Sequence, residues 1–342
     1  MMKKFIDIFA GMGTARMAFE QAGWECVYSI EWDKHKRKIY EIIFGKKPEG
    51  KDIKNARGTA LPTADCWVFG FPCQDISIAG KQLGFSGDKS SLYFEVMRLL
   101  YETAEENRPE WLLAENVKNF LSVNNGWDFL AAQIAMDEAG YDCQWYLLNS
   151  KDFGVPQNRE RVFLIGHSRI RGGRKIFFER KKYESFNCTN EAHRVGINAS
   201  FNKGISDKEI NIASCLQARN YKGIANRQEI TCVATSTLKQ IGNLYPDNPR
   251  NPEVGRIYDS NGISSCLNTA QGGNRQPKVI ESNNFRIRRL TPRECMRLQG
   301  VSDTITDKLI DAGISDTQMY RAAGDAMTVN VVYEIAKAIG RA

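Results

Sequence analysis

The stretch KKFIDIFAGMGTARMAFEQAGWECVYSIEWD, residues 3–33, decides the fold. Its first apolar, β-branched run (residues 3–10) is followed by a glycine-bearing turn, an amphipathic stretch (residues 14–23) and a second apolar run (residues 24–33). A strand, a helix and a second strand on this scale are typical of a parallel α/β sheet. The alternation continues to ERVFLIG at residues 160–166. We therefore expect an α/β fold with a doubly wound, mostly parallel sheet, whose ligands bind outside the carboxyl ends of the strands.

The composition excludes several classes of protein. Of the 342 residues, 42% are hydrophobic and 25% are charged, and the net charge of +7 is a mild tilt towards polyanions. No apolar run reaches the roughly 18 residues that span a bilayer, and MMKKFIDIFAG at the start lacks the features of a secretory signal. The nine cysteines form no C-x-x-C pair, and the three histidines lie in no metal-ligand spacing. We expect a cytoplasmic protein with no membrane segment, no disulfide framework and no metal.

The texture of the chain changes near residue 170. RIRGGRKIFFERKKYE is basic, and residues 187–284 are rich in Asn, Gly, Ser and Gln, which is typical of a smaller, loop-rich, mostly β unit. A degenerate repeat begins at residues 210 and 262, and both copies contain Ser-Cys-Leu before a polar tip. We expect a sheet-bearing domain, the smaller β domain, a hinge and connecting segment, and a C-terminal helix that returns to the first domain, at residues 1–185, 186–288, 289–321 and 322–342.

Several strand ends carry residues that suit a nucleotide. The turn DIFAGMG lets a ligand approach the next helix, although Arg16 replaces the glycine of a dinucleotide fingerprint. Glu31 ends the second run where an acid holds ribose hydroxyls, and Trp32 beside it can stack on a purine. In GKDIKN, Asp52 and Ile53 follow the next expected strand. Each feature alone also fits an ordinary turn or a solvated cap, but together they indicate an adenosine pocket.

Cys73 lies in VFGFPCQDIS, residues 68–77, just past the end of an apolar run and in a proline-bearing loop. A cysteine protease would need a histidine base, and none is near in sequence. Arginines are another way to favour a thiolate, and QNRERVF places Arg159 and Arg161 on one face of a strand. Glu115 ends the run in LLAENVKNF, where partial desolvation can raise the pKa of its carboxyl, although an exposed glutamate is the alternative.

These motifs, in this order, resemble those of the C5-cytosine DNA methyltransferases: FAGMG, GFPCQ, ENV, QNRER and RLTPRECMRLQG. The resemblance covers nearly the whole chain outside residues 170–280. It implies a Rossmann-like, S-adenosylmethionine-dependent methyltransferase fold, in which residues 1–185 bind cofactor and perform catalysis and residues 186–288 recognise the target. The implied activity is that of a DNA (cytosine-5-)-methyltransferase, EC 2.1.1.37. The implied partners of the expected monomer are double-stranded DNA and, as in bacterial and phage type II modification systems, a cognate restriction endonuclease acting on the same site.

The resemblance also implies the site residues. Those for the cofactor are Phe9, Gly11, Met12, Gly13, Glu31 (ribose), Trp32 (adenine face), Asp52 and Ile53 (adenine edge), Pro72, Leu92, Asp325 and Ala326. The catalytic residues are Cys73, which attacks cytosine C6, Glu115, which contacts N3 and the exocyclic amine, Arg159, and Arg161, which donates to O2. Addition of a thiolate at C6 makes C5 nucleophilic, and Glu115 and Arg161 stabilise the charge that develops on the ring. Because C6 is unreachable in the stack, the cytosine has to be flipped out of the duplex.

Two features of the sequence depart from the family pattern. Gly324, Asp325 and Ala326 stand where the family usually has Gly-Asn-Ser or Gly-Asn-Ala, and an acid there is expected to change contacts near the cofactor or the flipped base. Both repeat copies have Cys-Leu, at residues 215–216 and 266–267, where the family usually has Thr-Leu. A phosphate contact from that threonine is therefore not expected in this chain.

The DNA-contacting residues form the last set of expectations. Gln74 and Ser77 should face DNA by resemblance. The repeat tips offer Arg219, Gln271 and Arg275 as base readers and Lys222 as a phosphate contact, although solvated scaffold loops are the alternative. Three other functions remain open at this stage. They are a tRNA-methylating relative on the same fold, a catalytically dead DNA-binding module and, remotely because of Arg16, a nicotinamide oxidoreductase.

Overall fold

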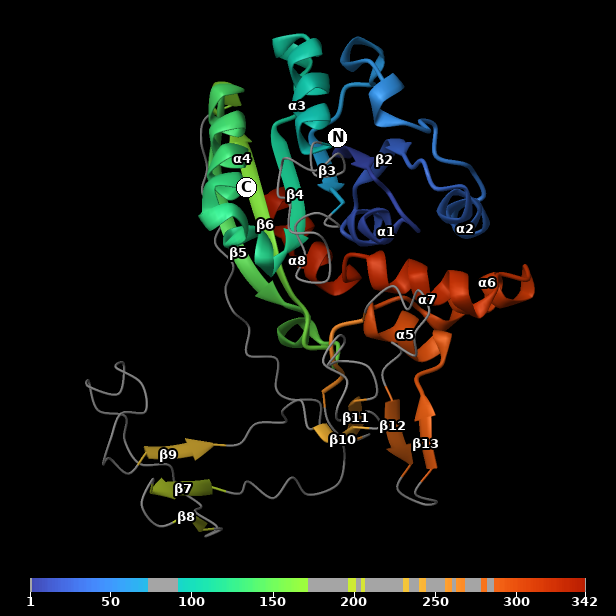
Figure 1. Cartoon of the computed structure of the whole chain (residues 1–342). Helices are drawn as coiled ribbons and strands as arrows, with labels where there is room; N and C mark the ends of the chain where they lie inside the picture. The colour runs from blue at the N-terminus through green and yellow to red at the C-terminus, as the bar shows by residue number, and fades with distance from the viewer. Residues whose placement is uncertain are drawn as a thin grey trace.

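The computed structural model describes most of the sheet-bearing part of the chain and separate short strands beyond it (Figure 1). The described residues are 2–72, 92–171, 196–200, 204–206, 230–233, 240–243, 256–259, 263–267, 278–281 and 286–341.

A six-stranded sheet in the order β2-β1-β3-β4-β6-β5 is the centre of the fold. Strands β1 to β4 pair in parallel, and β6 is antiparallel to both of its neighbours, β4 and β5. The predicted mostly parallel sheet is therefore confirmed, and the carboxyl ends of β1 to β4 meet at one edge. The strands are β1 (Lys4–Ile8), β2 (Glu25–Ile30), β3 (Cys66–Gly70), β4 (Trp111–Val117), β5 (Tyr141–Asn149) and β6 (Glu160–Ser168).

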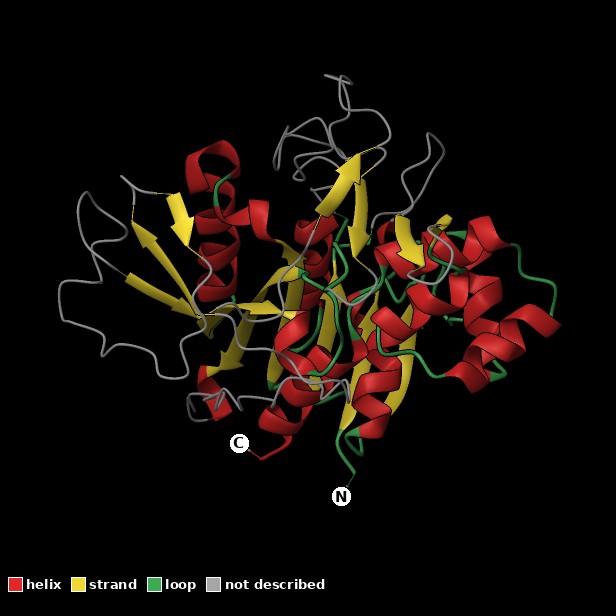
Figure 2. Cartoon of the chain, turned by 90° about the horizontal axis from the view of Figure 1, so that it is seen from below, coloured by secondary structure: helices red, strands yellow, loops and turns green. Residues whose placement is uncertain are grey.

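Helices cover both faces of this sheet because side chains along each buried strand alternate between two cores (Figure 2). Phe5 on β1 points to the face where α1 and α8 pack, and Ile6 points to the face where α3 and α4 pack. The expected C-terminal amphipathic helix is α8, which packs against α1. These helices are α1 (Thr14–Gln21), α2 (Lys34–Phe44), α3 (Leu92–Glu102), α4 (Trp127–Glu138) and α8 (Val329–Arg341).

Three shorter helices precede α8, and each begins with a side-chain cap. Thr291 and Glu294 form a reciprocal capping box at the start of α5, with Pro292 in the first helical position. The hydroxyl oxygens of Ser302 and Ser315 accept backbone N–H groups in the first turns of α6 and α7. These helices are α5 (Pro292–Leu298), α6 (Asp303–Asp311) and α7 (Asp316–Asp325).

Short strands make up most of the described residues between 196 and 289. One three-stranded sheet has the order β8-β7-β9 and one four-stranded sheet has the order β10-β11-β12-β13. These strands have three to five residues, which is consistent with the loop-rich β unit expected here. The boundaries of this unit at residues 186 and 288 stay a prediction. The strands are β7 (Gly196–Ser200), β8 (Gly204–Ser206), β9 (Ile230–Val233), β10 (Gln240–Asn243), β11 (Arg256–Asp259), β12 (Lys278–Glu281) and β13 (Arg286–Arg289).

The prediction of a strand before Asp52 is wrong. Gly50 makes one isolated parallel bridge to Ile30, and the chain then forms a 3-10 helix. A Cβ at Gly50 would lie 2.8 Å from Cγ1 of Ile30, so the glycine allows close contact with β2 without a ladder. The described 3-10 helices are η1 (Ile53–Asn55), η2 (Gly58–Ala60), η4 (Glu105–Asn107), η5 (Lys118–Leu121), η6 (Val123–Gly126), η7 (Ser150–Phe153) and η8 (Arg169–Arg171).

Candidate active site

A glycine-bearing turn joins β1 to α1 at the carboxyl edge of the sheet. Gly11 and Gly13 have φ of +61° and +88°, in the left-handed region that favours glycine, and Phe9 also has a φ of +61°. A Cβ at Gly13 would lie 2.2 Å from Cε2 of Phe44, so glycine is needed for α1 to begin this close to α2. At Gly11 the nearest atom to a Cβ would be the carbonyl oxygen of Phe9, at 3.9 Å. The turn therefore leaves its backbone open to a ligand.

Glu31 follows β2 and connects this turn to the start of α2. Its Oε2 accepts a hydrogen bond from N of Gly11 at 2.7 Å, and its Oε1 accepts one from N of Asp33 at 2.8 Å. A carboxylate has about four acceptor positions, so Glu31 can still accept ribose hydroxyls. The next side chain, Trp32, is 71% exposed and is thus available for stacking. Carboxylate, glycine turn and indole together fit a nucleoside.

The other predicted cofactor residues lie near this edge with different exposure. Asp52 accepts a hydrogen bond from the backbone of η1 at 3.0 Å, and Ile53 is buried in the core on the α3 side. Pro72 and Leu92 are half-buried. Met12 is only 2% exposed and packs in the core on the α1 side, so its side chain offers a ligand little surface.

Glu115 and Arg161 form an ion pair at the ends of two neighbouring strands. Glu115 lies on β4 and Arg161 on β6, and Nε of Arg161 is 3.2 Å from Oε1 of Glu115. The two side chains are 12% and 16% exposed. Burial raises the pKa of the Glu115 carboxyl above its ordinary value, although Arg161 and then Arg159 act to lower it. The site therefore holds a carboxyl with an increased tendency to carry a proton beside a guanidinium.

Asn116, the next residue on β4, connects this pair to Phe71, which follows β3. Its Nδ2 donates to the carbonyl oxygen of Phe71 at 3.2 Å, and it is 2% exposed. Sequence reasoning gave Asn116 no role, although its place in the ENV motif was a signal. The backbone two residues before Cys73 is thus tied to β4. Seven predicted residues lie outside the described residues: Cys73, Gln74, Ser77, Arg219, Lys222, Gln271 and Arg275.

Arg159 is buried and its terminal nitrogens are occupied by protein groups. Nη1 donates to the carbonyl oxygen of Leu267 at 3.1 Å, and Nη2 donates to those of Gly324 and Ala326 at 3.0 and 2.9 Å. Burial, followed by the charge of Arg161, lowers the pKa of Arg159. The charges of both arginines thus act to lower the pKa of Glu115. Arg161 pairs with the carboxylate directly, whereas Arg159 binds backbone carbonyl groups of two other chain segments.

Gln157 and Cys266 attach the second repeat copy to this edge. Gln157 is fully buried, accepts from N of Leu267 at 3.2 Å and donates to the carbonyl oxygen of Leu298 at 2.7 Å. Sγ of Cys266 lies 3.3 Å from Nη1 of Arg159 and 3.8 Å from Nη2 of Arg161. Enclosure by protein acts to raise the pKa of the Cys266 thiol, but the two arginines outweigh it and lower that pKa. The side chain at position 266, where the family usually has threonine, therefore contacts both arginines.

Asp325 and Ala326 end α7 close to the same edge. Oδ2 of Asp325 lies 2.7 Å from Nζ of Lys36 on α2, so its carboxylate is paired within the protein. Ala326 is 7% exposed and contributes its carbonyl oxygen to Arg159. The acid that departs from the family pattern is thus matched by a lysine.

Asp7 was missed by sequence reasoning. It lies in β1, is fully buried, and neither carboxylate oxygen has a hydrogen-bond partner among the described residues. Burial raises the pKa of Asp7 to about 8, even though the charge of Arg16 acts in the opposite direction. Arg16 itself donates to the hydroxyl of Tyr40 at 2.9 Å and pairs with Glu20 at 2.6 Å. An acid two residues after Phe5, and so on the same face of an apolar strand, was the signal that could have found it.

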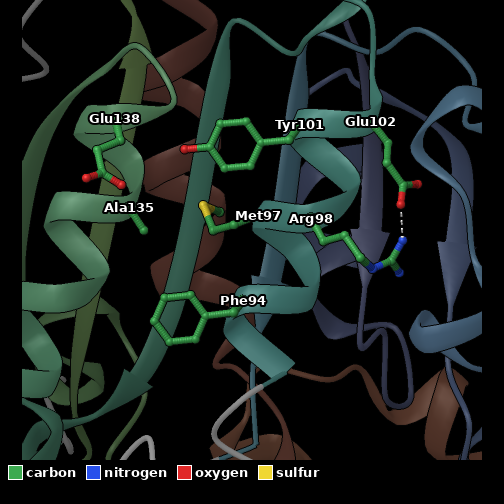
Figure 3. A pocket seen from close by; sticks show the side chains of 7 residues that line it. All are labelled: Phe94, Met97, Arg98, Tyr101, Glu102, Ala135 and Glu138. Carbon is green, nitrogen blue, oxygen red and sulfur yellow. Dashed lines mark hydrogen bonds and ion pairs between the residues drawn. The ribbon is translucent and has the colours of Figure 1, made fainter.

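A cavity of about 540 Å³ lies between α3 and α4, and no candidate site residue lines it (Figure 3). Its walls are two helices on one face of the sheet, whereas the site lies at the edge where the strands end. The lining residues are Phe94, Met97, Arg98, Tyr101, Glu102, Ala135 and Glu138.

Within the described ranges there is no cluster of three or more His, Cys, Asp or Glu that could hold a metal ion. The same ranges contain no helix long and apolar enough to cross a membrane.

Known structures share this fold. The S. pombe Dnmt2 methyltransferase matches with a TM-score of 0.67 at 16% identity, covering 100% of this chain and 99% of its own. A putative DNA modification methyltransferase encoded within an E. coli prophage matches with a TM-score of 0.64 at 19% identity, covering 99% of both chains. At these identities the likeness supports the methyltransferase fold and no finer assignment.

Sequence comparison gives the family. The family model for C-5 cytosine-specific DNA methylase matches residues 3–341. The Type II methyltransferase M.HhaI of Haemophilus parahaemolyticus is 33% identical over 338 residues, which cover 98% of this chain and 94% of that protein. The Type II methyltransferase M.HaeII of Haemophilus aegyptius is 32% identical over 341 residues, which cover 97% and 91%. The resemblance seen in the motifs is confirmed, and the chain belongs to the C5-cytosine DNA methyltransferase family.

Proposed function

We propose that this protein is a sequence-specific enzyme that flips a cytosine out of duplex DNA and methylates its C5, with S-adenosylmethionine as the donor, through a covalent adduct between Cys73 and C6. The observation that carries the proposal is the buried Glu115–Arg161 pair at the sheet edge. It lies beside the strand that leads to Cys73, and Gly11, Glu31 and Trp32 lie at the same edge.

The cofactor half of the site is the glycine turn with the segment after β2. Glu31 would accept the ribose hydroxyls, Trp32 would stack on the adenine, and the open backbone at Gly11 would take the amino-acid end. S-adenosylmethionine, when bound there, supplies an activated methyl group. Because Glu31 also holds N of Gly11 and N of Asp33, the shape of this half is set before any ligand arrives.

The substrate half is built around the strand ends of β3, β4 and β6. Glu115, whose carboxyl has a raised pKa, would share its proton with N3 of the cytosine, and Arg161 would donate to O2. Withdrawal of charge at these two atoms makes attack by the Cys73 thiolate on C6 easier. Once C5 carries the methyl group, loss of the C5 proton and of the Cys73 thiolate would restore the aromatic ring. Asn116 anchors the carbonyl oxygen of Phe71 and so limits where the Cys73 loop can begin.

The smaller β unit at residues 186–288 would read the target sequence. Its tips carry Arg219, Gln271 and Arg275, whose donor sets suit guanine and adenine edges, and Lys222, which suits phosphate. Gln157 and Arg159 support this assignment because they bind the second repeat copy directly to the catalytic edge. A cognate restriction endonuclease for the same site fits with the type II names of the relatives.

A trapped adduct tests the proposal. The protein is incubated with S-adenosylmethionine and a library of duplexes that carry 5-fluorocytosine, and a denaturing gel shows any covalent complex. We expect a complex with duplex DNA for the wild type and none for Cys73→Ser. A complex that persists in Cys73→Ser would refute the nucleophile, and a complex formed with tRNA instead of DNA would refute the substrate. Bisulfite sequencing of DNA from an expressing host then identifies the target site.

A further inference from the structure

One side of α7 is fastened to the first turn of α2 by three polar pairs. Nζ of Lys36 lies 2.7 Å from Oδ2 of Asp325, and Nη2 of Arg321 lies 3.1 Å from Oδ2 of Asp33. The third pair joins Nε2 of Gln318 to Nδ1 of His35 at 2.7 Å. Positions 318, 321 and 325 follow helical spacing, so they share one side of α7.

The Lys36–Asp325 pair includes the residue that departs from the family pattern. Asp325 stands where the family pattern has asparagine, and an aspartate there adds a negative charge close to the predicted cofactor edge. Lys36 supplies the opposite charge, and its side chain is only 18% exposed, against 32% for Asp325. Removal of either partner would therefore leave a partly buried charge without its counter-ion.

Hydrogen bonds connect this pair to both halves of the site. On the α2 side, Asp33 caps the helix and its N is held by Glu31, which also holds Gly11. On the α7 side, the carbonyl oxygens on either side of Asp325 are bound by Arg159. The end of α7 thus lies between the cofactor turn and the arginines near Glu115.

We propose that Lys36 and Asp325 are positioning residues that hold the end of α7 against the first turn of α2 and thereby set the affinity of the enzyme for its cofactor. This inference rests on the function proposed above. Neither residue needs to touch the cofactor, because the pair acts through the placement of Glu31 and Trp32. The consequence is a selective effect on cofactor binding, with little effect on the chemical step once the cofactor is bound.

Isothermal titration of the full-length protein with S-adenosylmethionine, without DNA, measures this affinity directly. We expect Lys36→Met and Asp325→Ala each to raise the Kd by about twofold to fivefold, the effect of losing an ion pair near the protein surface. The double variant leaves no unpaired charge, so its Kd should be no higher than that of the single variant that binds the cofactor less tightly. The single-turnover rate of Lys36→Met at saturating cofactor should change by less than about twofold, because the interaction is the same before and during methyl transfer.

Lys337→Met is the matched control. Lys337 pairs with Glu334 on α8 at 3.5 Å, and their exposures of 26% and 25% are similar to those of Lys36 and Asp325. It should leave the Kd unchanged, and thermal melting of every variant shows whether any loss is one of stability alone. The inference is wrong if the fold-increase in Kd of the double variant equals the product of the two single fold-increases. It is also wrong if Lys337→Met raises the Kd as much as Lys36→Met does. Neither result would contradict the proposed function. If the wild type binds no S-adenosylmethionine, the proposed function itself is wrong.

Discussion

Gly70→Ala should slow methyl transfer because Gly70 provides the room for the Glu115 carboxylate. Gly70 ends β3 directly opposite Glu115 in the parallel register. A Cβ at this position would lie 3.2 Å from Oε2 of Glu115 and 3.2 Å from Cε of Met327, so these atoms have to move by a few tenths of an ångström. Since a displacement of about 1 Å in an active site can cost about a hundredfold in rate, we expect a loss of about tenfold here.

The assay is single-turnover methyl transfer with saturating cofactor and duplex DNA, together with the free energy of unfolding in urea. Gly166→Ala on β6 is the control, because its Cβ would be equally tight, at 3.3 Å from both Sδ of Met136 and Cβ of Tyr141, and touches no site group. Both variants should lose about 1–3 kcal/mol of stability from overpacking, but only Gly70→Ala should lose rate. Equal rates for the two variants would refute the idea that Gly70 makes space for Glu115.

Three further outcomes are expected. Glu115→Gln should still bind cofactor but slow single-turnover methyl transfer by about a hundredfold or more, since a positioned proton donor is lost; wild-type rates would contradict its role. The free energy of unfolding of the wild type in urea should fall by up to a few kcal/mol between about pH 4 and about pH 8. In this range the folded state keeps the Asp7 proton, because its pKa is about 8, whereas the unfolded state has lost it. Asp7→Asn should flatten this pH dependence, and an unchanged slope in the variant would show that Asp7 is not its cause. Arg159→Lys should destabilise the fold by about 2–4 kcal/mol, because an ammonium cannot reach all the carbonyl oxygens that the guanidinium binds, and unchanged unfolding in urea would show that these bonds are dispensable.

The sequence predicts the strand ends well because they follow from local pattern and from one topological rule. Alternating apolar runs locate the strands and helices, and parallel pairing brings the strand ends to one edge. Glu31 and Glu115 were therefore expected at the same edge without any distance being known, whereas Arg161 stands at the start of β6 and reaches this edge because β6 is antiparallel to β4. The glycines of the β1–α1 turn were found in the same way, because their φ values are the reason for their residue type.

What the sequence could not predict depends on contacts between distant parts of the chain. The spacing of Arg159 and Arg161 placed both side chains on one strand face, but Arg159 is bound by carbonyl oxygens of residues 267, 324 and 326. Met12 lies in the cofactor motif, yet its side chain is in the core. The strand expected before Asp52 is replaced by a single bridge, because a short run can be held by one close glycine contact instead of a ladder.

A carboxyl beside an arginine would ordinarily be ionised, so its use as a proton donor needs an explanation, and the two oxygens of Glu115 provide one. Oε1 lies 3.2 Å from Nε of Arg161, whereas Oε2 lies beside Gly70, where a Cβ would be 3.2 Å from it. Burial outweighs the arginines and raises the pKa of the carboxyl. A proton on Oε2 would leave the pairing of Oε1 with Arg161 in place. We therefore expect Oε2, the oxygen that is not paired with Arg161, to meet the N3 edge of the flipped cytosine.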